Sequence, residues 1–414
     1  MKRLLAFLLR RRHPYEPLIQ VEISADRLIH NLEEFRKMAP NGVLAPVLKS
    51  NAYGHGLVEV ARILETENSR SKRMLKSEYP AIPFFVIDSY FEALALRSAG
   101  IKTPLLIIGY APLETMLASR LKDISFTVTS LEALETLSKS IDGSSVSISK
   151  PLRIHLKIDT GMHRQGILLN EIGRAIDLMH ANEKIFLEGI CSHLSDADNG
   201  DSAFTQSQIA AWNKSVERFK SAFPSLRYIH LSNTDGHRFS TEITANVSRL
   251  GLGLYGIVDG ASFKPALNLL PALEMKTTLT GVKKIRKGEH VGYSNTFTAP
   301  KDMTIATIPA GYFEGIDRRL SNVGFVLVGE RQIPCPIIGR VSMNITVIDV
   351  SKVPEAKIGT RVLLISNTST DPNSIRNIAK ACGTIAYEIA VHVPAHLKRS
   401  TVGTSGLAVQ NKKV

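Results

Sequence analysis

Apolar residues in the first two thirds of the chain form short runs that alternate with segments of helical periodicity. The runs have the length of strands and lie near 43–48, 83–87, 104–108, 124–128, 152–158, 186–191, 228–231 and 246–252. Segments between them have the apolar spacing of amphipathic helices, among them 91–100, 131–140, 171–179 and 207–219. This alternation predicts an α/β protein with a (β/α)8 barrel of the TIM type. A doubly wound sheet is the alternative, but no Gly-x-Gly-x-x-Gly opens the first helix.

The pattern changes near residue 268. From there to residue 400, short strands are separated by glycine and proline turns, and only 371–381 shows a helical repeat. This pattern predicts a C-terminal, mainly-β domain. We therefore expect four parts in chain order: a basic N-terminal extension, a barrel domain that opens with an alternating strand over 18–24, a β-strand domain and a flexible tail, at 1–17, 18–267, 268–400 and 401–414.

The net charge changes this picture little. The formal charge is +13, which could indicate a nucleic-acid or membrane partner. Nine cationic residues stand in acid-free termini, within 1–12 and 398–414, and they leave only +4 for the body of the chain. A nucleic-acid-binding groove is therefore not expected. No apolar run reaches the length of a membrane span, and the apolar residues 4–9 are too few for a signal peptide.

The three cysteines, Cys191, Cys335 and Cys382, are far apart in the sequence and lack metal-ligand spacing. They argue against a disulfide scaffold and for a reducing compartment. We therefore expect a cytoplasmic protein without a bound metal.

Lys49 is the first candidate for chemistry. The strand-like run 43–48 ends on it, and a polar turn with Asn51, Tyr53 and Gly54 follows. A barrel places its active site at the carboxyl ends of its strands. An amine at that position can form a Schiff base with a carbonyl cofactor or substrate, whereas most lysines at the start of a loop are simply exposed.

The segment VLKSNAYGHG around Lys49 resembles the pyridoxal-phosphate attachment segment of the alanine racemase family, with Ser50 in place of an alanine. The resemblance covers about residues 18–400, and relative to the family 66–80 is a polar surface insertion. It implies that Lys49 binds pyridoxal 5′-phosphate and also serves as a catalytic base. It also implies that Tyr53 lies near the phosphate.

Two further segments resemble parts of the family's barrel site. KIDTGM with Arg164 implies that Lys157 is a lysine often carbamylated, which orients Arg164 toward the substrate carboxylate. A guanidinium suits that role because its two parallel N–H groups fix a carboxylate. His193, after an apolar strand, is implied to lie beside the pyridine ring. Asn233 and Thr234 stand where the family has asparagine and serine, and a hydroxyl at a helix N-terminus suits a phosphate.

The segment SRLGLGLYG is also similar to the family's, and it implies that Arg249 faces the pyridine nitrogen while Gly251 and Leu252 offer backbone N–H groups to the phosphate. A guanidinium cannot give up its proton at working pH, so it can only donate to an unprotonated ring nitrogen. The cofactor is then a weaker electron sink than it would be beside a carboxylate. This favours racemisation over transamination.

The β domain carries the second base in this family. HVGYSNTFTA resembles the segment that holds it, which implies Tyr293. Racemisation needs acid–base groups on both faces of the α-carbon, so Lys49 and Tyr293 would form a two-base pair. Tyr312 would line the entrance, and Met343 would contact the substrate carboxylate through its backbone N–H. The resemblance implies a head-to-tail homodimer in which these β-domain residues complete the partner's site.

Three positions depart from the family pattern. His163 stands where a glycine is usual, Glu314 replaces a frequent aspartate, and Asn344 replaces the usual aspartate of G-R-V-S-M-D. The last change removes a carboxylate expected at the entrance but leaves the residues of the core chemistry in place.

Together these inferences predict a pyridoxal-phosphate-dependent isomerase that interconverts L-alanine and D-alanine through an external aldimine and supplies D-alanine for peptidoglycan. A racemase of another small amino acid, such as serine, is the first alternative. A decarboxylase of the same architecture is disfavoured by Arg249 and Tyr293, because such enzymes carry a glutamate and a cysteine in those roles. A non-catalytic pyridoxal-phosphate-binding homeostasis protein is disfavoured because it would lack the β domain.

Overall fold

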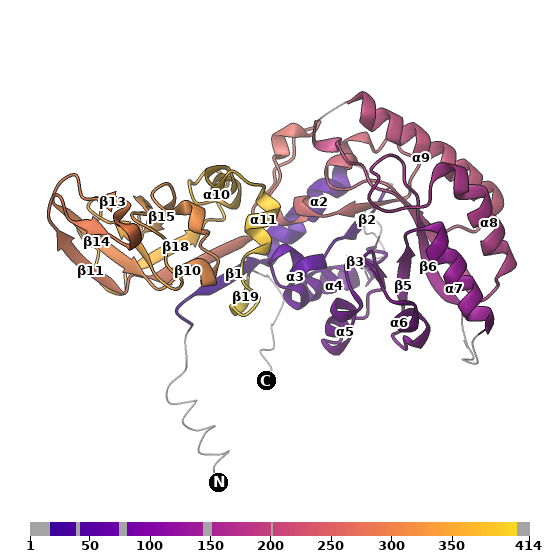
Figure 1. The fold of residues 1–414 in the computed structure, drawn as a ribbon, viewed down its shortest axis with the longest axis horizontal. Coiled ribbons are helices and arrows are strands. Elements are labelled where there is room, and N and C mark those ends of the chain that lie inside the picture. The colour runs from indigo at the N-terminus through magenta and orange to yellow at the C-terminus, as the bar shows by residue number, and fades with distance from the viewer. Residues whose placement is uncertain (1–16, 39–41, 74–80, 144–150, 200–201, 404–414) are drawn as a thin grey trace, which may run out of the picture. The chain divides into compact units, whose positions relative to one another are not determined.

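The computed structural model of the chain describes residues 17–38, 42–73, 81–143, 151–199 and 202–403. The chain divides into two compact units (Figure 1). Residues 25–270 form one unit, and the described residues before 25 join those from 271 onward in the other. Among the described residues, no helix is long and apolar enough to cross a membrane.

Parallel strands form a closed ring in the first unit. They are β2 (Val43–Pro46), β3 (Phe85–Ile87), β4 (Leu105–Ile107), β5 (Ile124–Val128), β6 (Leu152–Lys157), β7 (Ile185–Cys191), β8 (Tyr228–His230) and β9 (Val247–Leu250). Strands β3 to β8 pair in chain order, and β2 pairs with β9. The ring closes where Val47 bridges Val86 and where the Arg249 N–H donates to the Ser232 carbonyl at 3.0 Å. The predicted (β/α)8 barrel is therefore confirmed. Each predicted run coincides with one of these strands, and only β7 begins outside its run, by one residue.

Helices follow the strands and cover the outside of the barrel (Figure 1). They are α2 (Ala25–Met38), α3 (Lys49–Tyr53), α4 (Leu57–Arg73), α5 (Tyr90–Ser98), α6 (Leu113–Ala118), α7 (Leu131–Gly143), α8 (Ile172–Ala181) and α9 (Ala203–Ala222). Ser89 and Ser202 cap α5 and α9 by accepting backbone N–H bonds from the first turn of each helix. The predicted insertion 66–80 begins as the last two turns of α4, and its remainder, 74–80, lies outside the described residues.

The second unit is mainly β, as predicted. Its largest sheet has the order β16-β15-β18-β10-β1-β19, beside a three-stranded sheet β11-β14-β17 and a ribbon β12-β13. The strands are β1 (Gln20–Ser24), β10 (Leu273–Thr278), β11 (Gly281–Ile285), β12 (His290–Val291), β13 (Phe297–Thr298), β14 (Met303–Ile308), β15 (Phe325–Val328), β16 (Ile333–Pro336), β17 (Thr346–Asp349), β18 (Arg361–Ile365) and β19 (Arg399–Val402). Two helices, α10 (Ile375–Cys382) and α11 (Ala386–Val391), complete it.

Strand β1 differs from the sequence prediction in the unit it joins. It was expected to open the barrel domain, but it pairs antiparallel with β10 and parallel with β19. Its alternating side chains Val21 and Ile23 are fully buried. Alternation predicts which face of a strand is buried but not which sheet receives it. Because β1 offers β19 a partner, ordered structure also reaches Val402, within the predicted flexible tail, while residues 1–16 and 404–414 lie outside the described residues.

Strand β1 gives a test of this topology. Ile23→Ala should lower the free energy of unfolding by about 2–5 kcal/mol, because it leaves a cavity in the sheet of the second unit. Leu18→Ala is the matched control, since Leu18 is 60% exposed and should change that free energy by no more than about 0.5 kcal/mol. Denaturant unfolding monitors both variants. Equal stability of the two variants would contradict the placement of β1.

Candidate active site

Lys49 stands at the carboxyl end of β2 and begins α3. The next four residues have left-handed backbone conformations, with φ of 56°, 55°, 53° and 51° from Ser50 to Tyr53. This conformation costs about 1–2 kcal/mol for each non-glycine residue. The sequence predicted a polar turn here but not its hand. A run of strained residues directly after the candidate lysine is typical of a functional site.

Two side chains, Asn51 within the turn and Glu92 outside it, hold the turn in place. The Asn51 side-chain oxygen accepts the Leu57 N–H at 2.9 Å, and the Asn51 N–H donates to Oε1 of Glu92 at 3.3 Å. The other oxygen of Glu92 accepts the Asp88 N–H at 2.8 Å. Glu92 was not predicted as a site residue. Its one sequence signal is an acidic residue in the first turn of a helix, and the structure shows that it is buried. It ties the lysine-bearing turn to the next strand–helix unit.

Arg249 is buried and makes hydrogen bonds through both terminal nitrogens. Its Nη1 donates to the carbonyl oxygen and Nδ1 of His230, at 2.9 and 2.7 Å. Its Nη2 donates to the carbonyls of Ser192 and Leu231, at 2.7 and 3.0 Å, and to Nδ1 of His193 at 3.2 Å. Among the described residues, no hydrogen bond uses its Nε–H. The guanidinium is therefore oriented firmly while one donor remains for a ligand.

His193 lies among positive charges. Burial, followed by the charges of Arg249, Arg164, Lys157 and Lys49, lowers the pKa of His193 well below its usual range. The imidazole is therefore neutral near pH 7. Because a guanidinium can only donate, Nδ1 of His193 accepts from Arg249 and its own proton sits on Nε2. The structure thus brings Lys49 and the predicted arginines and histidine into one electropositive region.

A second group of predicted residues converges on the hydroxyl of Thr234. This oxygen accepts the N–H groups of Gly251 and Gly253, at 3.1 and 3.2 Å. A Cβ on Gly251 would lie 3.1 Å from Oη of Tyr53 and 3.6 Å from Oγ1 of Thr234, so a glycine keeps this space open. Leu252 follows, buried, at the start of the 3-10 turn Leu252–Tyr255. The hydroxyls of Tyr53 and Thr234 border this space and can donate to an anion, and we call the space the anion cradle. The Gly251 N–H, predicted to reach a phosphate, donates to Thr234 instead.

Asn233 has a local role in the described structure. Its side-chain oxygen accepts the Gly236 N–H at 2.8 Å and so fixes the turn that carries Thr234. Tyr255, which sequence reasoning did not single out, supports the same region. Its hydroxyl donates to the Val47 carbonyl at 2.8 Å, and its ring contacts that of Tyr53 at 5.3 Å between centroids. The aromatic spacing alone gave no signal for this contact.

Lys157 is the last residue of β6, and Arg164 lies in the loop that follows this strand. Burial lowers the pKa of Lys157, and the charges of Arg164, Arg249 and Lys49 lower it further. The Lys157 amine donates to the Gln165 side-chain oxygen at 3.1 Å, and Arg164 is exposed. His163 has φ of 54°, a conformation for which glycine is better suited. As a free amine, Lys157 contacts only the uncharged Gln165 side chain here and is repelled by the positive charge of Arg164. In this form it cannot attract and orient Arg164.

The three predicted residues of the second unit lie in adjoining surface loops of that unit. Tyr293 is 69% exposed, and Tyr312 and Met343 are also exposed. The Tyr312 N–H donates to the Ser342 carbonyl at 3.0 Å, which ties two of these loops together. A Cβ on Gly292 would lie 3.2 Å from the Arg340 nitrogen, so the loop before Tyr293 approaches the same segment closely.

The departures at Glu314 and Asn344 are coupled. The Asn344 amide donates to Oε1 of Glu314 at 2.7 Å, while Oε2 of Glu314 accepts the Gly311 N–H at 2.8 Å. Glu314 is buried. An aspartate at residue 344 would place a second carboxylate against it, so the asparagine matches the longer glutamate.

Fold and site together define a two-domain barrel enzyme with a lysine-centred, cation-rich site at the carboxyl ends of the barrel strands. The profile described as "Alanine racemase, N-terminal domain" matches residues 23–259, and that described as "Alanine racemase, C-terminal domain" matches residues 272–401. The chain belongs to the alanine racemase family.

Individual relatives agree over nearly the whole chain. The alanine racemase of Lactobacillus acidophilus is 34% identical, with 92% of this chain and 96% of the relative covered. The solved alanine racemase of Clostridium difficile 630 superposes with a TM-score of 0.82 at 28% identity, covering 94% of this chain and 96% of that one. A histidine racemase from Leuconostoc mesenteroides shares the fold, with a TM-score of 0.78 at 24% identity over 94% of this chain and 99% of that one.

The contact between Asn344 and Glu314 can be tested by charge. In Asn344→Asp, two adjacent carboxylates cannot both ionise, so the pKa of one rises in the folded state. Relative to the parent, the free energy of unfolding should then fall as pH rises above about 4, by about 1–3 kcal/mol near neutrality. Denaturant unfolding between acid and neutral pH measures it. Adding Glu314→Gln should restore a pH-independent difference, and a flat profile for Asn344→Asp alone would refute the contact.

Proposed function

We propose that this protein is an alanine racemase that interconverts L-alanine and D-alanine with pyridoxal 5′-phosphate as its cofactor. The observation that carries the proposal is the position of Lys49 on a strained turn at the carboxyl end of β2, in the same region as buried Arg249 and the anion cradle. The relative at 34% identity is named an alanine racemase. The histidine racemase supports the fold alone, so it does not favour a second function.

The residues present fit this cofactor at both of its ends. The open space at Gly251, between the hydroxyls of Tyr53 and Thr234, suits a phosphate, and the Leu252 N–H lies next to it in sequence. The uncommitted Nε–H of Arg249 suits an unprotonated pyridine nitrogen. Neutral His193 would lie against the ring, with Asn233 fixing the phosphate-binding turn. When bound, the cofactor supplies an electron sink for the α-carbon of the amino acid.

The remaining chemistry falls to side chains of this chain. Nζ of Lys49 holds the cofactor and exchanges a proton on one face of the α-carbon, and Oη of Tyr293 exchanges one on the other face. Arg164 binds the substrate carboxylate, with the Met343 backbone N–H as a second donor. Tyr312 lines the entrance. Two bases on opposite faces are required because one base on one face would return the starting enantiomer.

Lys157 completes the carboxylate clamp as a carbamate. Its lowered pKa increases the fraction of neutral amine, the form that reacts with carbon dioxide. The reaction replaces a cation beside Arg164 with an anion. Arg164 is then attracted and oriented instead of being repelled.

The proposed working form is a head-to-tail homodimer. Tyr293, Tyr312 and Met343 are exposed side chains on adjoining loops of the second unit, which suits residues that act in a partner subunit's barrel. The product, D-alanine, would be supplied to peptidoglycan synthesis from the cytoplasm. All three cysteines are free and buried, which fits a reducing compartment.

Incubation with a panel of L-amino acids, including alanine, serine and histidine, followed by chiral analysis of the products, tests the activity. Lys49→Ala should abolish racemisation and the near-visible absorption of the bound cofactor, because no other amine replaces its covalent link. Lys122→Ala, an exposed barrel lysine, is the matched control and should retain both. An unchanged absorption band in Lys49→Ala, or no turnover of alanine by the parent, would contradict the proposal.

Tyr293→Phe separates the two bases. It should reduce racemisation by about 10²-fold or more, the usual contribution of a positioned acid–base group. The near-visible absorption should stay, and so should solvent exchange of the α-proton in the enantiomer served by Lys49. Tyr110→Phe, at a tyrosine 79% exposed on the barrel unit, serves as the control. Full racemisation by Tyr293→Phe would remove this residue from the two-base pair.

A further inference from the structure

A line of buried side chains continues from Arg249 away from the anion cradle. Nη1 of Arg249 lies 2.7 Å from Nδ1 of His230, and Nε2 of His230 lies 2.8 Å from Nδ1 of His155. Nε2 of His155 lies 3.7 Å from Oε2 of Glu188. All four side chains are buried. The line crosses the barrel interior through β9, β8, β6 and β7.

The direction of hydrogen donation along this line is fixed from the Arg249 end. A guanidinium has only donors, so Nδ1 of His230 accepts and its proton sits on Nε2. Nδ1 of His155 must then accept, which places the His155 proton on Nε2, facing Glu188. Nε2 of His155 makes no hydrogen bond within the described residues, but the Glu188 charge at 3.7 Å favours a proton on this nitrogen. Burial lowers the pKa of both histidines, and the charge of Arg249 lowers it further. Glu188 raises the pKa of His155, but by less than burial lowers it, so both rings are neutral near pH 7.

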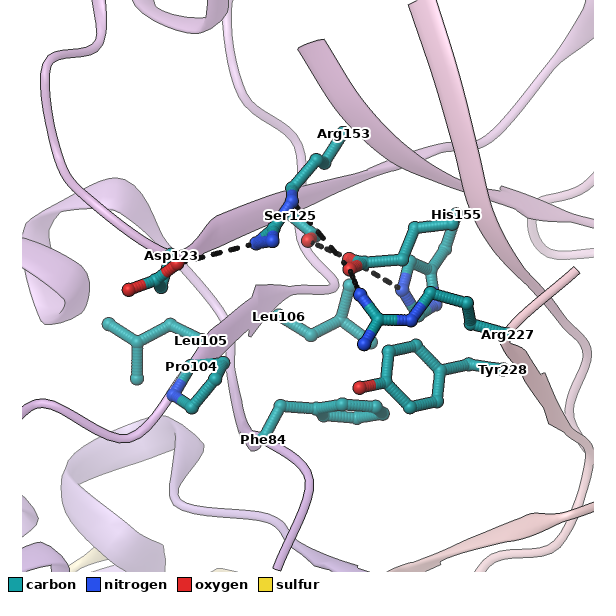
Figure 2. A pocket seen from close by; sticks show the side chains of 11 residues that line it. Phe84, Pro104, Leu105, Leu106, Asp123, Ser125, Arg153, His155, Arg227 and Tyr228 are labelled. Atoms are coloured by element: carbon teal, nitrogen blue, oxygen red, sulfur yellow. Dashed lines mark hydrogen bonds and ion pairs between the residues drawn. The ribbon is translucent and has the colours of Figure 1, made fainter. Parts of the chain in front are cut away.

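Glu188 lines a pocket of about 100 Å³ at the amino ends of the barrel strands, the end opposite to Lys49. Figure 2 shows other residues of this lining, among them Ser125, His155 and Arg227. Burial alone would raise the pKa of Glu188, but its contacts with His155, Ser125 and Arg153 lower it below its usual value. Nη1 of Arg227 lies 3.4 Å away, and the Ser125 hydroxyl donates to the same carboxylate. The group therefore stays charged in a buried position that the proposed reaction does not use.

A bulge and a glycine in β7 allow the contact between His155 and Glu188. The register of β6 and β7 shifts between Ile154 and His155, so that His155 faces Gly189 and Glu188 has no partner of its own. Such a bulge redirects a side chain. A Cβ on Gly189 would lie 2.7 Å from the His155 ring, so only glycine leaves room for that ring. Tyr228 stacks on the ring at 5.8 Å between centroids.

We propose that Glu188 is a positioning residue that acts on Arg249 through His155 and His230; the functional part of this inference rests on the proposed racemase activity. The carboxylate draws the histidine protons toward itself and increases electron density at Nδ1 of His230. Polarisation of this kind strengthens successive hydrogen bonds by about 10–30% each. The hydrogen bond from Arg249 to Nδ1 of His230 is then stronger, so the guanidinium is held more firmly. The negative charge of Glu188 partly compensates its positive charge on the side remote from the cofactor. The guanidinium becomes a weaker donor to the ring nitrogen, which disfavours transamination.

The test compares two carboxylates of one pocket. Glu188→Gln keeps the side-chain shape but removes its charge. Asp123→Asn is the matched control, because Asp123 lines the same pocket and pairs with Arg153 at 3.6 Å but makes no contact with His155. Its φ of 51° is a conformation that asparagine adopts readily. Holoprotein labelled with ¹⁵N-histidine reports the ring nitrogens of both histidines by NMR.

In the parent protein, both rings should be neutral with the proton on Nε2. Glu188→Gln should shift the resonances of His155 Nε2 and His230 Nδ1 and lower the ratio of racemisation to transamination severalfold, while Asp123→Asn should change neither. If Glu188→Gln does not fold, Ser125→Ala, which removes one donor to the carboxylate, should shift the same resonances. An unchanged His230 Nδ1 resonance would overturn the proposal. If the resonances shift as expected but the protein does not racemise alanine, the proposed function is refuted and the effect of Glu188 on the two histidines is still supported.

Discussion

The buried guanidinium of Arg249 is the constraint on which the barrel site depends. A charge in the protein interior is costly unless hydrogen bonds satisfy it. Here the partners are backbone carbonyls and neutral imidazoles, and within the described parts of the chain no carboxylate bonds to it. Three strand ends, β7, β8 and β9, must therefore stay in register to supply them. The same network leaves a fixed cation next to His193, in the electropositive region that includes Lys49, and so sets the electrostatics of the site.

The fold was predictable from the sequence to the extent that it follows from periodicity. Most barrel strands are short runs rich in apolar residues and bounded by polar turns, and such runs are visible without a structure. The partner of β1 was not predictable, because alternation specifies a face and not a sheet. The hand of the turn after Lys49 was also invisible, since Ser50, Asn51 and Ala52 have no residue-level signature for consecutive left-handed conformations.

The candidate site divides along a similar line. Lys49, Arg249 and Thr234 stand in contiguous motifs, and motifs at strand ends can be read from one sequence. Glu92, His155 and Glu188 are polar residues that belong to no contiguous motif. In a sequence such residues are indistinguishable from satisfied core groups, and only the contact between strands far apart in the chain shows what they touch. The hydrogen bond between Asn344 and Glu314 was likewise not predictable, because these two departures from the family pattern lie in separate segments of the sequence.

The sheet position of β1 has a consequence for biosynthesis. Its residues leave the ribosome before any other described element, but its neighbour β10 begins at Leu273 and its other neighbour, β19, at Arg399. At about 5–20 residues per second, the first of these partners arrives roughly 10–50 s later. The barrel can complete its ring during that interval, whereas the strand that begins the described chain must wait with its apolar face unpaired. The last unit to be translated is thus closed by the first strand to be made, and the sheet of that unit cannot be complete until the chain is almost fully synthesised.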